Sequence, residues 1–526
     1  MPARLIRLCG HDYDEKMSHH TLTRVSRRSL LAGGAALFGS TALAGPQRTM
    51  RPVARSGAVA EVASSPSEAR PVARKGAVDL IAAAGLAGQV GFVISDAASG
   101  EVMEVVDGQV GRPPASVTKA LTAVYALEIL GPDYRFETQV LGTGPVLDGV
   151  LDGDLILAGG GDPNLVTDEL AQLVQQLADE GLKQVTGRFL VWGNALPGVK
   201  EIEPGQLDQL GYNPSLGGLN LNFNRVFFEW ALSGADYTLS LDARSETLRP
   251  VVTTARMQIV DRSVPVYSYA EGAGVDEWTV AKGALGKAGS RWLPVRFPAL
   301  YAGDVFRTLA QDAGIGLPAA AVVDDLPAGT QLALFESVPL AQMLRDMLLY
   351  STNLTAEAVG MTATAKRVGT ARAMRTSAMT MAQWLKARAG LTLHLADHSG
   401  LSDENRVSAL DMVRLLNANL VQAQLQPLMK SIAMVDDNRR AIKDFPASVR
   451  AKTGTLNFVS TLAGYLDTDT GRKLSFAIFA YDPEARTASL SSQDEQPRGA
   501  SGFNGKAKGL QQDLLQRWAG LGRISG

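Results

Sequence analysis

Three short motifs contain the residue types that a serine acyl-transfer site needs, and they follow one another in a fixed order. They are Ser116-Val-Thr-Lys119, Ser351-Thr-Asn353 and Lys452-Thr-Gly-Thr455. A serine becomes a useful nucleophile when a neighbouring base removes its proton, and a lysine can be that base. Each motif alone is weak, because its residue types are common. Together, their order and surroundings predict covalent catalysis by a serine.

The first motif opens a predicted amphipathic helix, residues 116–130, which the preceding pair Pro113-Pro114 keeps from starting earlier. One helical turn separates Ser116 from Lys119, so their side chains can meet. The positive end of the helix dipole would stabilise an alkoxide there. A lysine with the usual pKa of about 10.4 must be buried or placed beside another cation, here Lys452, to act as a base. The predicted inward face of this helix consists of Val117, Leu121, Val124 and Leu127.

The alternative for this motif alone is a surface serine and lysine on an ordinary helix.

The second motif follows Tyr350 and precedes a predicted helix at residues 353–368. Asn353 could therefore be only the N-cap of that helix. In the functional interpretation, Ser351 passes a proton to the leaving amine, and the Asn353 amide holds a substrate carbonyl. The presence of the other two motifs favours the functional interpretation.

The third motif lies in a stretch whose alternation predicts an edge strand, to which an extended peptide can pair. Lys452 and Thr453 would bind a free substrate carboxylate, and Gly454 would allow a close backbone approach. The backbone N–H groups of Thr455 and Ser116 would form an oxyanion hole. A hairpin start without function is the alternative for this motif alone.

Around the motifs, the hydrophobic patterns predict an α+β fold. Two strands near the start of the folded part, residues 89–96 and 101–107, are separated by a turn. A hairpin at 459–468 and 473–482 and a helix at 506–519 come near the end. Strands at both ends with helices between them suit one sheet built from distant parts of the chain.

Composition divides the 526 residues into five segments. A Gly- and Pro-rich middle part with short predicted strands is interpreted as an insertion into a two-part domain. The predicted segments are a signal peptide at 1–44, a disordered linker at 45–76, the first part of the main domain at 77–146, inserted domains at 147–334 and the second part of the main domain at 335–526.

The N-terminal segment has the pattern of a twin-arginine export signal. Ser26-Arg-Arg-Ser-Leu-Leu31 precedes an apolar run that ends in the cleavage pattern Ala42-Leu-Ala44. The alternative, a membrane anchor, would need roughly 20 apolar residues, more than this run provides. Cleavage would remove Cys9, the one cysteine, and leave a cysteine-free protein suited to an oxidising periplasm. The true start is Met1 or Met17.

Several other classes of site are not supported. The net charge of −2, with no basic stripe, argues against a nucleic-acid partner. A Ser-His-Asp triad needs a histidine, and beyond the signal segment the chain offers only His394 and His398. Their spacing resembles a zinc pair but lacks a nearby carboxylate helix. We expect neither metal nor cofactor.

With these residues in view, the chain resembles penicillin-binding proteins and serine β-lactamases. The motif spacing, 235 residues from Ser116 to Ser351 and 99 from Asn353 to Lys452, resembles the low-mass class C penicillin-binding proteins of peptidase family S13. The resemblance covers roughly residues 80–520. Further stretches similar to that family are residues 153–163, 219–226, 299–304 and 397–408.

The resemblance implies a DD-peptidase/β-lactamase-like domain, with a five-stranded, mainly antiparallel sheet between helical layers and two smaller inserted domains. It implies removal of the terminal D-Ala, and often cleavage of D-Ala–diaminopimelate cross-links. The partners would be peptidoglycan stem peptides ending in D-Ala-D-Ala, with β-lactams as covalent inhibitors. By resemblance, Ser116 is the nucleophile, Lys119 its base, Ser351 and Asn353 the second motif, and residues 452–455 the third.

Two residues depart from the family pattern: Gly160 and His398 stand where Ser and Gly are expected. Two other functions remain open from the sequence. One is a β-lactamase or esterase with the same motifs, although no dedicated deacylating carboxylate is evident. The other is a peptidoglycan-binding protein without catalysis, for which a lysine beside the serine would have no use.

Overall fold

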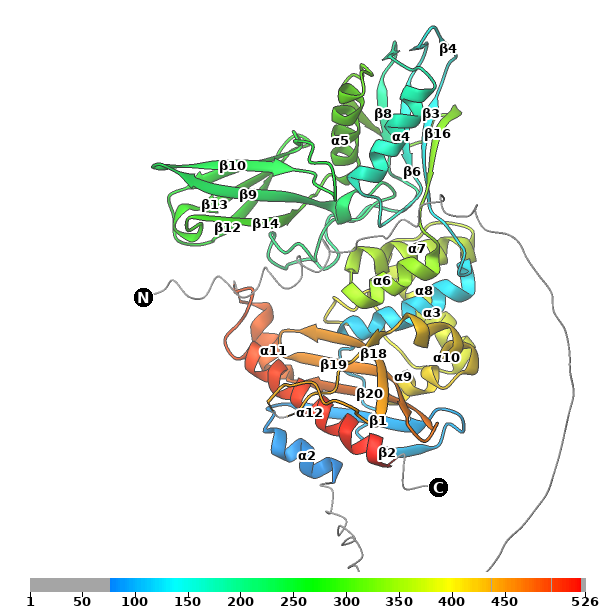
Figure 1. Cartoon of the computed structure of the whole chain (residues 1–526), viewed down its shortest axis with the longest axis vertical. Helices are drawn as coiled ribbons and strands as arrows, with labels where there is room; N and C mark the ends of the chain where they lie inside the picture. Colours follow the sequence, from blue (N-terminus) through cyan, green and yellow to red (C-terminus); the bar gives the residue numbers. More distant parts are fainter. Residues whose placement is uncertain (1–75, 437, 493, 522–526) are drawn as a thin grey trace, which may run out of the picture. The chain divides into compact units, whose positions relative to one another are not determined.

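A computed structural model describes residues 76–436, 438–492 and 494–521 (Figure 1). The predicted signal peptide at 1–44, with Cys9, and residues 45–75 of the predicted linker lie outside the described residues. Within the described ranges, no helix combines the length and the apolar character needed to span a membrane.

The third motif lies in a six-stranded antiparallel sheet with strand order β17-β18-β19-β20-β1-β2, and the other two motifs lie beside this sheet. Strands from both ends of the chain meet in its middle, as expected, because β1 pairs with β20 from Gln89 opposite Tyr481 onward. Five strands are long, and the two-residue β17 adds a short sixth at one edge. The bounds are β1 Gln89–Asp96, β2 Val102–Val106, β17 Lys430–Ser431, β18 Ala447–Leu456, β19 Val459–Thr468 and β20 Lys473–Tyr481.

Helices cover both faces of this sheet. Helices α2 (Ala77–Ala84) and α12 (Ala500–Leu521) lie on one face, where Phe92 of β1 packs against Trp518 with ring centroids 5.5 Å apart. Val93, the next residue of β1, points to the opposite face and joins the core formed with α3. Because successive side chains of a strand point to opposite faces of the sheet, β1 contributes to two separate cores. The second face is covered by α3 (Thr118–Leu130), α6 (Leu340–Tyr350), α7 (Asn353–Val368), α8 (Met374–Ala389), α9 (Ala409–Leu416) and α10 (Asn419–Leu425).

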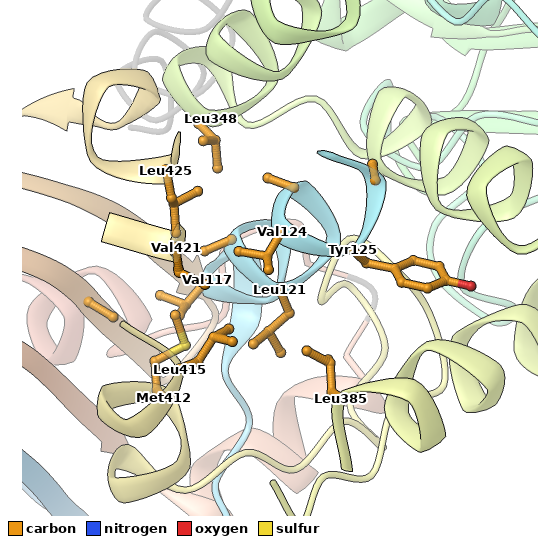
Figure 2. Close-up of a cluster of buried hydrophobic side chains, with 14 of the residues drawn as sticks. Val117, Leu121, Val124, Tyr125, Leu348, Leu385, Met412, Leu415, Val421 and Leu425 are labelled. Atoms are coloured by element: carbon orange, nitrogen blue, oxygen red, sulfur yellow. The ribbon is translucent and has the colours of Figure 1, made fainter. Parts of the chain in front are cut away.

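Helix α3 is buried on every side, which corrects the prediction of an amphipathic helix. All its residues from Thr118 to Leu127 are buried. The predicted inward residues Val117, Leu121 and Val124 do face apolar side chains of the surrounding helices (Figure 2). The small side chains on the rest of the helix allow the neighbouring elements to approach equally closely, so no face is left for solvent. Those small residues are Ala120, Ala123 and Ala126.

The middle of the chain forms sheets of its own. Strand β3 (Glu137–Gly142) pairs with β16 (Thr330–Glu336), and both belong to a five-stranded sheet with order β15-β8-β6-β3-β16. Helices α4 (Thr167–Asp179) and α5 (Pro298–Asp312) share a core with this sheet. Since β3 belongs to it, this sheet starts before residue 147; the division into two inserted domains remains a prediction.

Three small sheets complete this middle part, with strand orders β10-β9-β14, β11-β13-β12 and β4-β5-β7. The remaining bounds are β4 Val146–Leu147, β5 Val150–Leu151, β6 Leu155–Gly159, β7 Gln184–Val185, β8 Phe189–Trp192, β9 Arg225–Ser233, β10 Asp236–Asp242, β11 Ala255–Val260, β12 Tyr267–Glu271, β13 Asp276–Ala281, β14 Ala288–Pro294, β15 Ala320–Val323 and α11 Pro483–Leu490. Short 3₁₀ helices are η1 Ala115–Val117, η2 Asn222–Asn224, η3 Lys282–Ala284 and η4 Gln426–Leu428.

Candidate active site

The first motif sits where η1 runs into α3. Ser116 lies in the 3₁₀ turn and not in the α-helix itself, and Lys119 Nζ donates a hydrogen bond to Ser116 Oγ at 3.1 Å. Ala115 just before it has a φ of 45°, which is strained for a residue with a Cβ atom. The hydroxyl of Thr118 donates to the Ala115 carbonyl at 2.9 Å and helps to hold this turn.

Lys119 is fully buried and has three oxygen partners. Besides Ser116 Oγ, its Nζ donates to Asn353 Oδ1 at 2.7 Å and to the Ser399 carbonyl at 2.9 Å. Burial lowers the pKa of Lys119 to about 7, although the negative charges of Asp397 and Glu357 act in the opposite direction. A lysine in this environment can be neutral near physiological pH and accept the proton of Ser116.

The second motif joins two helices at the site. Ser351 ends α6 with a φ of 64°, and the N-cap of α7 is Thr352. Asn353 is therefore not the N-cap, which corrects that alternative. Its side chain bonds elsewhere: Oδ1 accepts from Lys119, and Nδ2 donates to the Tyr212 carbonyl at 2.8 Å.

The third motif brings a second buried lysine to the site. Lys452 Nζ donates to Ser351 Oγ at 2.9 Å and to the Thr453 carbonyl at 2.7 Å. Burial lowers the pKa of Lys452 well below its usual value, and the charges of Lys119 and Lys430 lower it further. All three motifs thus meet: Lys119 connects Ser116 with Asn353, and Lys452 connects Ser351 with β18.

Gly454 lets β18 lie directly against η1. A Cβ atom at this position would be 2.1 Å from Thr461 Oγ1, 2.9 Å from the Pro114 carbonyl oxygen and 3.0 Å from Ala115 Cβ. The predicted close approach at Gly454 is confirmed, and the approaching backbone is that of the nucleophile turn. Beside it, Thr453 and Thr455 are exposed. Among the described strands, β17 pairs only with Arg450 and Ala451 of β18, so the edge beyond them has no strand partner.

Two acidic residues that the motifs did not predict lie behind Lys119. Glu357 lies on α7, one turn after Asn353, and Asp397 begins the loop of residues 397–402. Both are fully buried. The spacing of Asn353 and Glu357, which puts them on one face of a helix, was the available signal.

His398, the unusual residue of that loop, faces away from Lys119. Its Nε2 is 2.8 Å from Ser377 Oγ, and its ring packs against Gly360 of α7. Burial lowers the pKa of His398 to about 3, so the ring is neutral. His394 joins the Arg406 backbone through an isolated β-bridge.

A protein-family model matches most of the chain. The family model described as D-Ala-D-Ala carboxypeptidase 3 (S13) matches residues 76–496, which include all three motifs. The chain belongs to the S13 family. It is therefore an enzyme of the serine-type D-Ala-D-Ala carboxypeptidase class, and the family predicted from the motifs is confirmed.

Curated S13-like relatives match most of the chain. A D-alanyl-D-alanine carboxypeptidase DacB of Haemophilus influenzae is 25% identical over 411 residues, which cover 74% of this chain and 85% of the relative. A D-alanyl-D-alanine carboxypeptidase of an Actinomadura species is 27% identical, with 74% of this chain and 77% of the relative covered.

The fold comparison agrees with the S13 assignment. The crystal structure of penicillin binding protein 4 from Haemophilus influenzae superposes with a TM-score of 0.68 at 20% identity, covering 84% of this chain and 99% of that chain. This similarity confirms the α+β fold of the DD-peptidase type. A second structure of that protein holds a β-lactam and superposes with a TM-score of 0.65 at 21% identity, covering 84% of this chain and 99% of that chain.

Proposed function

We propose that this protein is a periplasmic serine D-Ala-D-Ala carboxypeptidase that trims peptidoglycan stem peptides through an acyl-enzyme at Ser116. The observation that carries the proposal is the 3.1 Å contact between Lys119 Nζ and Ser116 Oγ in a buried environment. It places a lysine that can be neutral within reach of the proton that a nucleophilic serine must lose.

In the acylation step, Ser116 Oγ attacks the carbonyl carbon of the penultimate D-Ala and its proton passes to Lys119 Nζ. A tetrahedral intermediate forms, and its oxyanion is held by the backbone N–H groups of Ser116 and Thr455. The contact of Gly454 with the nucleophile turn supports this, because it brings the two segments together.

The peptide C–N bond then breaks and the terminal D-Ala leaves as an amine. Its nitrogen needs a proton, which Ser351 Oγ supplies while it takes one from Lys452 Nζ; the 2.9 Å contact between these two groups supports the relay. A water molecule then attacks the ester. Its oxygen joins the acyl carbon, its proton returns to the Ser351–Lys452 pair, and Lys119 gives its proton back to the departing Ser116 Oγ. The Asn353 amide orients a substrate carbonyl during these steps.

Recognition of the substrate would use the edge of β18. An extended stem peptide would pair with this edge beyond the short strand β17, and the Thr453 hydroxyl would bind the terminal carboxylate. Lys452 is almost completely buried, so its contribution to carboxylate binding would come from its charge and from holding Thr453 and Ser351. Endopeptidase cleavage is the same reaction with a cross-linking amine as the leaving group.

Penicillin labelling tests the proposal. Protein beginning at Gly45 is incubated with a fluorescent penicillin and then examined by intact mass and peptide mapping. We expect one stable adduct on the peptide that contains Ser116. Ser116→Ala should abolish both the adduct and the release of D-Ala, whereas Ser448→Ala, an exposed serine of β18, should change neither.

Each other outcome selects another function. An adduct on the Ser116→Ala protein would mean that the nucleophile is misassigned. Rapid turnover of penicillin without a lasting adduct would favour a β-lactamase. Folded wild-type protein that forms no adduct but still binds peptidoglycan would favour a non-catalytic wall-binding protein.

A further inference from the structure

Two carboxylates behind Lys119 belong to none of the three motifs. The side chains of Glu357 and Asp397 are fully buried, as is Lys119 itself, and each of them interacts electrostatically with Lys119. Burying a carboxylate costs free energy unless it is paired or hydrogen-bonded. Two of them beside one catalytic lysine therefore call for a functional explanation.

Glu357 and Lys119 both hydrogen-bond to the backbone of Ser399. Its Oε1 accepts the N–H of Ser399 at 2.8 Å, and its Oε2 accepts the N–H of His398 at 2.9 Å. The carbonyl oxygen of the same Ser399 accepts the hydrogen bond from Lys119 Nζ at 2.9 Å. A shift of Glu357 would therefore move the acceptor that orients the amine.

Asp397 holds the other end of the same loop. Its Oδ1 accepts the N–H of Gly400 at 2.7 Å, and its Oδ2 accepts the N–H of Ser402 at 2.6 Å. Gly400, with a φ of 82°, lies so close to the nucleophile turn that a Cβ atom would be 1.8 Å from the Ala115 carbonyl oxygen. The two carboxylates thus fix a loop that contacts both the base and the turn of the nucleophile.

We propose that Glu357 and Asp397 are positioning residues of the acylation step, which orient Lys119 through Ser399 and act on its amine through their charge. The proposal rests on the proposed function, since it takes Lys119 as the base of Ser116. By accepting or releasing a proton, the acid pair would decide whether Lys119 is neutral when substrate arrives. The pair touches no substrate and acts only through Lys119.

The directions of the pKa shifts support this coupling. Burial, and then the charge of Asp397, raise the pKa of Glu357, and burial also raises the pKa of Asp397. Burial lowers the pKa of Lys119 to about 7. The acids and the amine thus approach one another in proton affinity, and two interacting buried carboxylates resist losing both protons.

The other charged groups near this cluster come from four different elements. Lys452 of β18 faces Lys119 with a like charge. The charge of Glu203, from the middle of the chain, repels that of Asp397, whereas the charge of Arg375 of α8 attracts it. Glu404 in turn repels Glu203. His398 is neutral. Among the described groups that shift the pKa of Lys119, Glu357 and Asp397 are the negatively charged ones.

The test is the pH dependence of penicillin acylation in Glu357→Gln. The glutamine carbonyl oxygen can keep the position of Oε1, which accepts from both Ser399 and His398, while its amide group replaces Oε2 and removes the charge. The charge of Glu357 raises the pKa of Lys119, so its loss should move the acid limb of the profile to lower pH. A midpoint one unit lower would raise the rate at pH 6, relative to its plateau, about fivefold.

Thr364→Val is the matched control, because Thr364 is a buried polar residue of the same helix that hydrogen-bonds Ser377 and Tyr125. It should lower stability and leave the pH midpoint in place. Asp397→Asn is the second variant and should move the midpoint in the same direction. A midpoint that stays at the wild-type value in both folded carboxylate variants would overturn the proposal.

A second measurement separates this inference from the proposed function. The titration of Lys119, followed by ¹³C NMR of its side chain in wild type and Glu357→Gln, needs no turnover. A lower pKa of Lys119 in the variant supports the inference, and an unchanged pKa overturns it. Absence of an adduct on Ser116 in the wild type would overturn the proposed function, while the titration would still decide the electrostatic coupling.

Discussion

At the scale of single residues, the chemistry depends on two lysines that have almost no exposed surface. The Nζ atoms of Lys119 and Lys452 each contact a serine hydroxyl, at 3.1 and 2.9 Å. Burial is the main cause of the lowered pKa of both. Removal from water therefore does more than the repulsion between two cations to make Lys119 a base.

The pKa of Lys119 predicts how penicillin acylation depends on pH. Because only the neutral amine can accept the proton of Ser116, the rate should rise through a midpoint near pH 7, where burial places the pKa of Lys119. Stopped-flow or gel-based labelling between pH 5 and 9 measures this. A rate that still rises above pH 9 would mean that Lys119 keeps its ordinary pKa.

Lys119→Arg tests whether proton acceptance, and not only positive charge, is required. A guanidinium stays charged at all accessible pH values, so acylation should fall by about 10²–10⁴-fold at every pH. Single-turnover labelling of the variant measures the loss, with its circular dichroism spectrum as a check of folding. Labelling within a few-fold of wild type would rule out Lys119 as the base.

At the scale of elements, the site depends on the close contact between β18 and η1. Thr461 of β19 donates its hydroxyl to the Pro114 carbonyl at 2.7 Å, so two neighbouring strands both touch the nucleophile turn. Gly454 makes this possible, because any side chain there would meet backbone and Thr461. The reactive turn is thus held by the sheet and not by its own helix alone.

Gly454→Ala should separate β18 from η1. The added methyl group would overlap Thr461 Oγ1 and the Pro114 carbonyl. We expect a loss of about 1–3 kcal/mol in the free energy of unfolding, with a larger effect on acylation, because the oxyanion hole spans the two segments. Urea unfolding and penicillin labelling measure the two effects.

Gly509→Ala is the matched control for that variant. Gly509 lies within α12, and a Cβ atom there would have no neighbour within 4 Å. Alanine in a helix interior is favoured over glycine by about 1 kcal/mol, so this variant should gain stability and acylate normally. Equal behaviour of the two variants would contradict a special role for Gly454.

At the scale of the whole molecule, the middle part of the chain takes part in the site. The Tyr212 carbonyl accepts the hydrogen bond from Asn353 Nδ2. Its segment is fixed by the almost completely buried Arg296, whose guanidinium donates to the carbonyls of Lys200 and Asn213 at 2.9 Å each and of Asp208 at 3.1 Å. A segment far from the motifs in sequence therefore helps to orient a motif residue.

Arg296→Lys should loosen this segment. A lysine cannot reach three carbonyls at once, so we expect a loss of about 1–3 kcal/mol in stability and a several-fold slower acylation. The pH midpoint should stay unchanged, since no charge near Lys119 is altered. Arg188→Lys, at an exposed ion pair with Asp154, is the control and should behave as wild type. An acylation rate equal to wild type in Arg296→Lys would show that the segment is not needed to orient Asn353.

The sequence by itself determined the local features of this protein. The bounds of α7 and β19 agree with those predicted, because apolar spacing and turn residues act over a few neighbouring positions. The family followed from the three motifs and their order. Gly454 also indicated a close approach of two backbones, because the absence of a side chain can be read directly from the sequence.

Only the tertiary structure decided which groups surround Lys119. The carboxylates of Glu357 and Asp397 and the carbonyl of Ser399 belong to segments more than 230 residues away from Lys119 in sequence. The burial of Lys119 likewise depends on packing between distant segments. The all-round burial of α3 and the place of β3 in the middle sheet also arise from such long-range packing. Solvent exclusion and distances between remote segments are properties of the packed chain, so no local pattern specifies them.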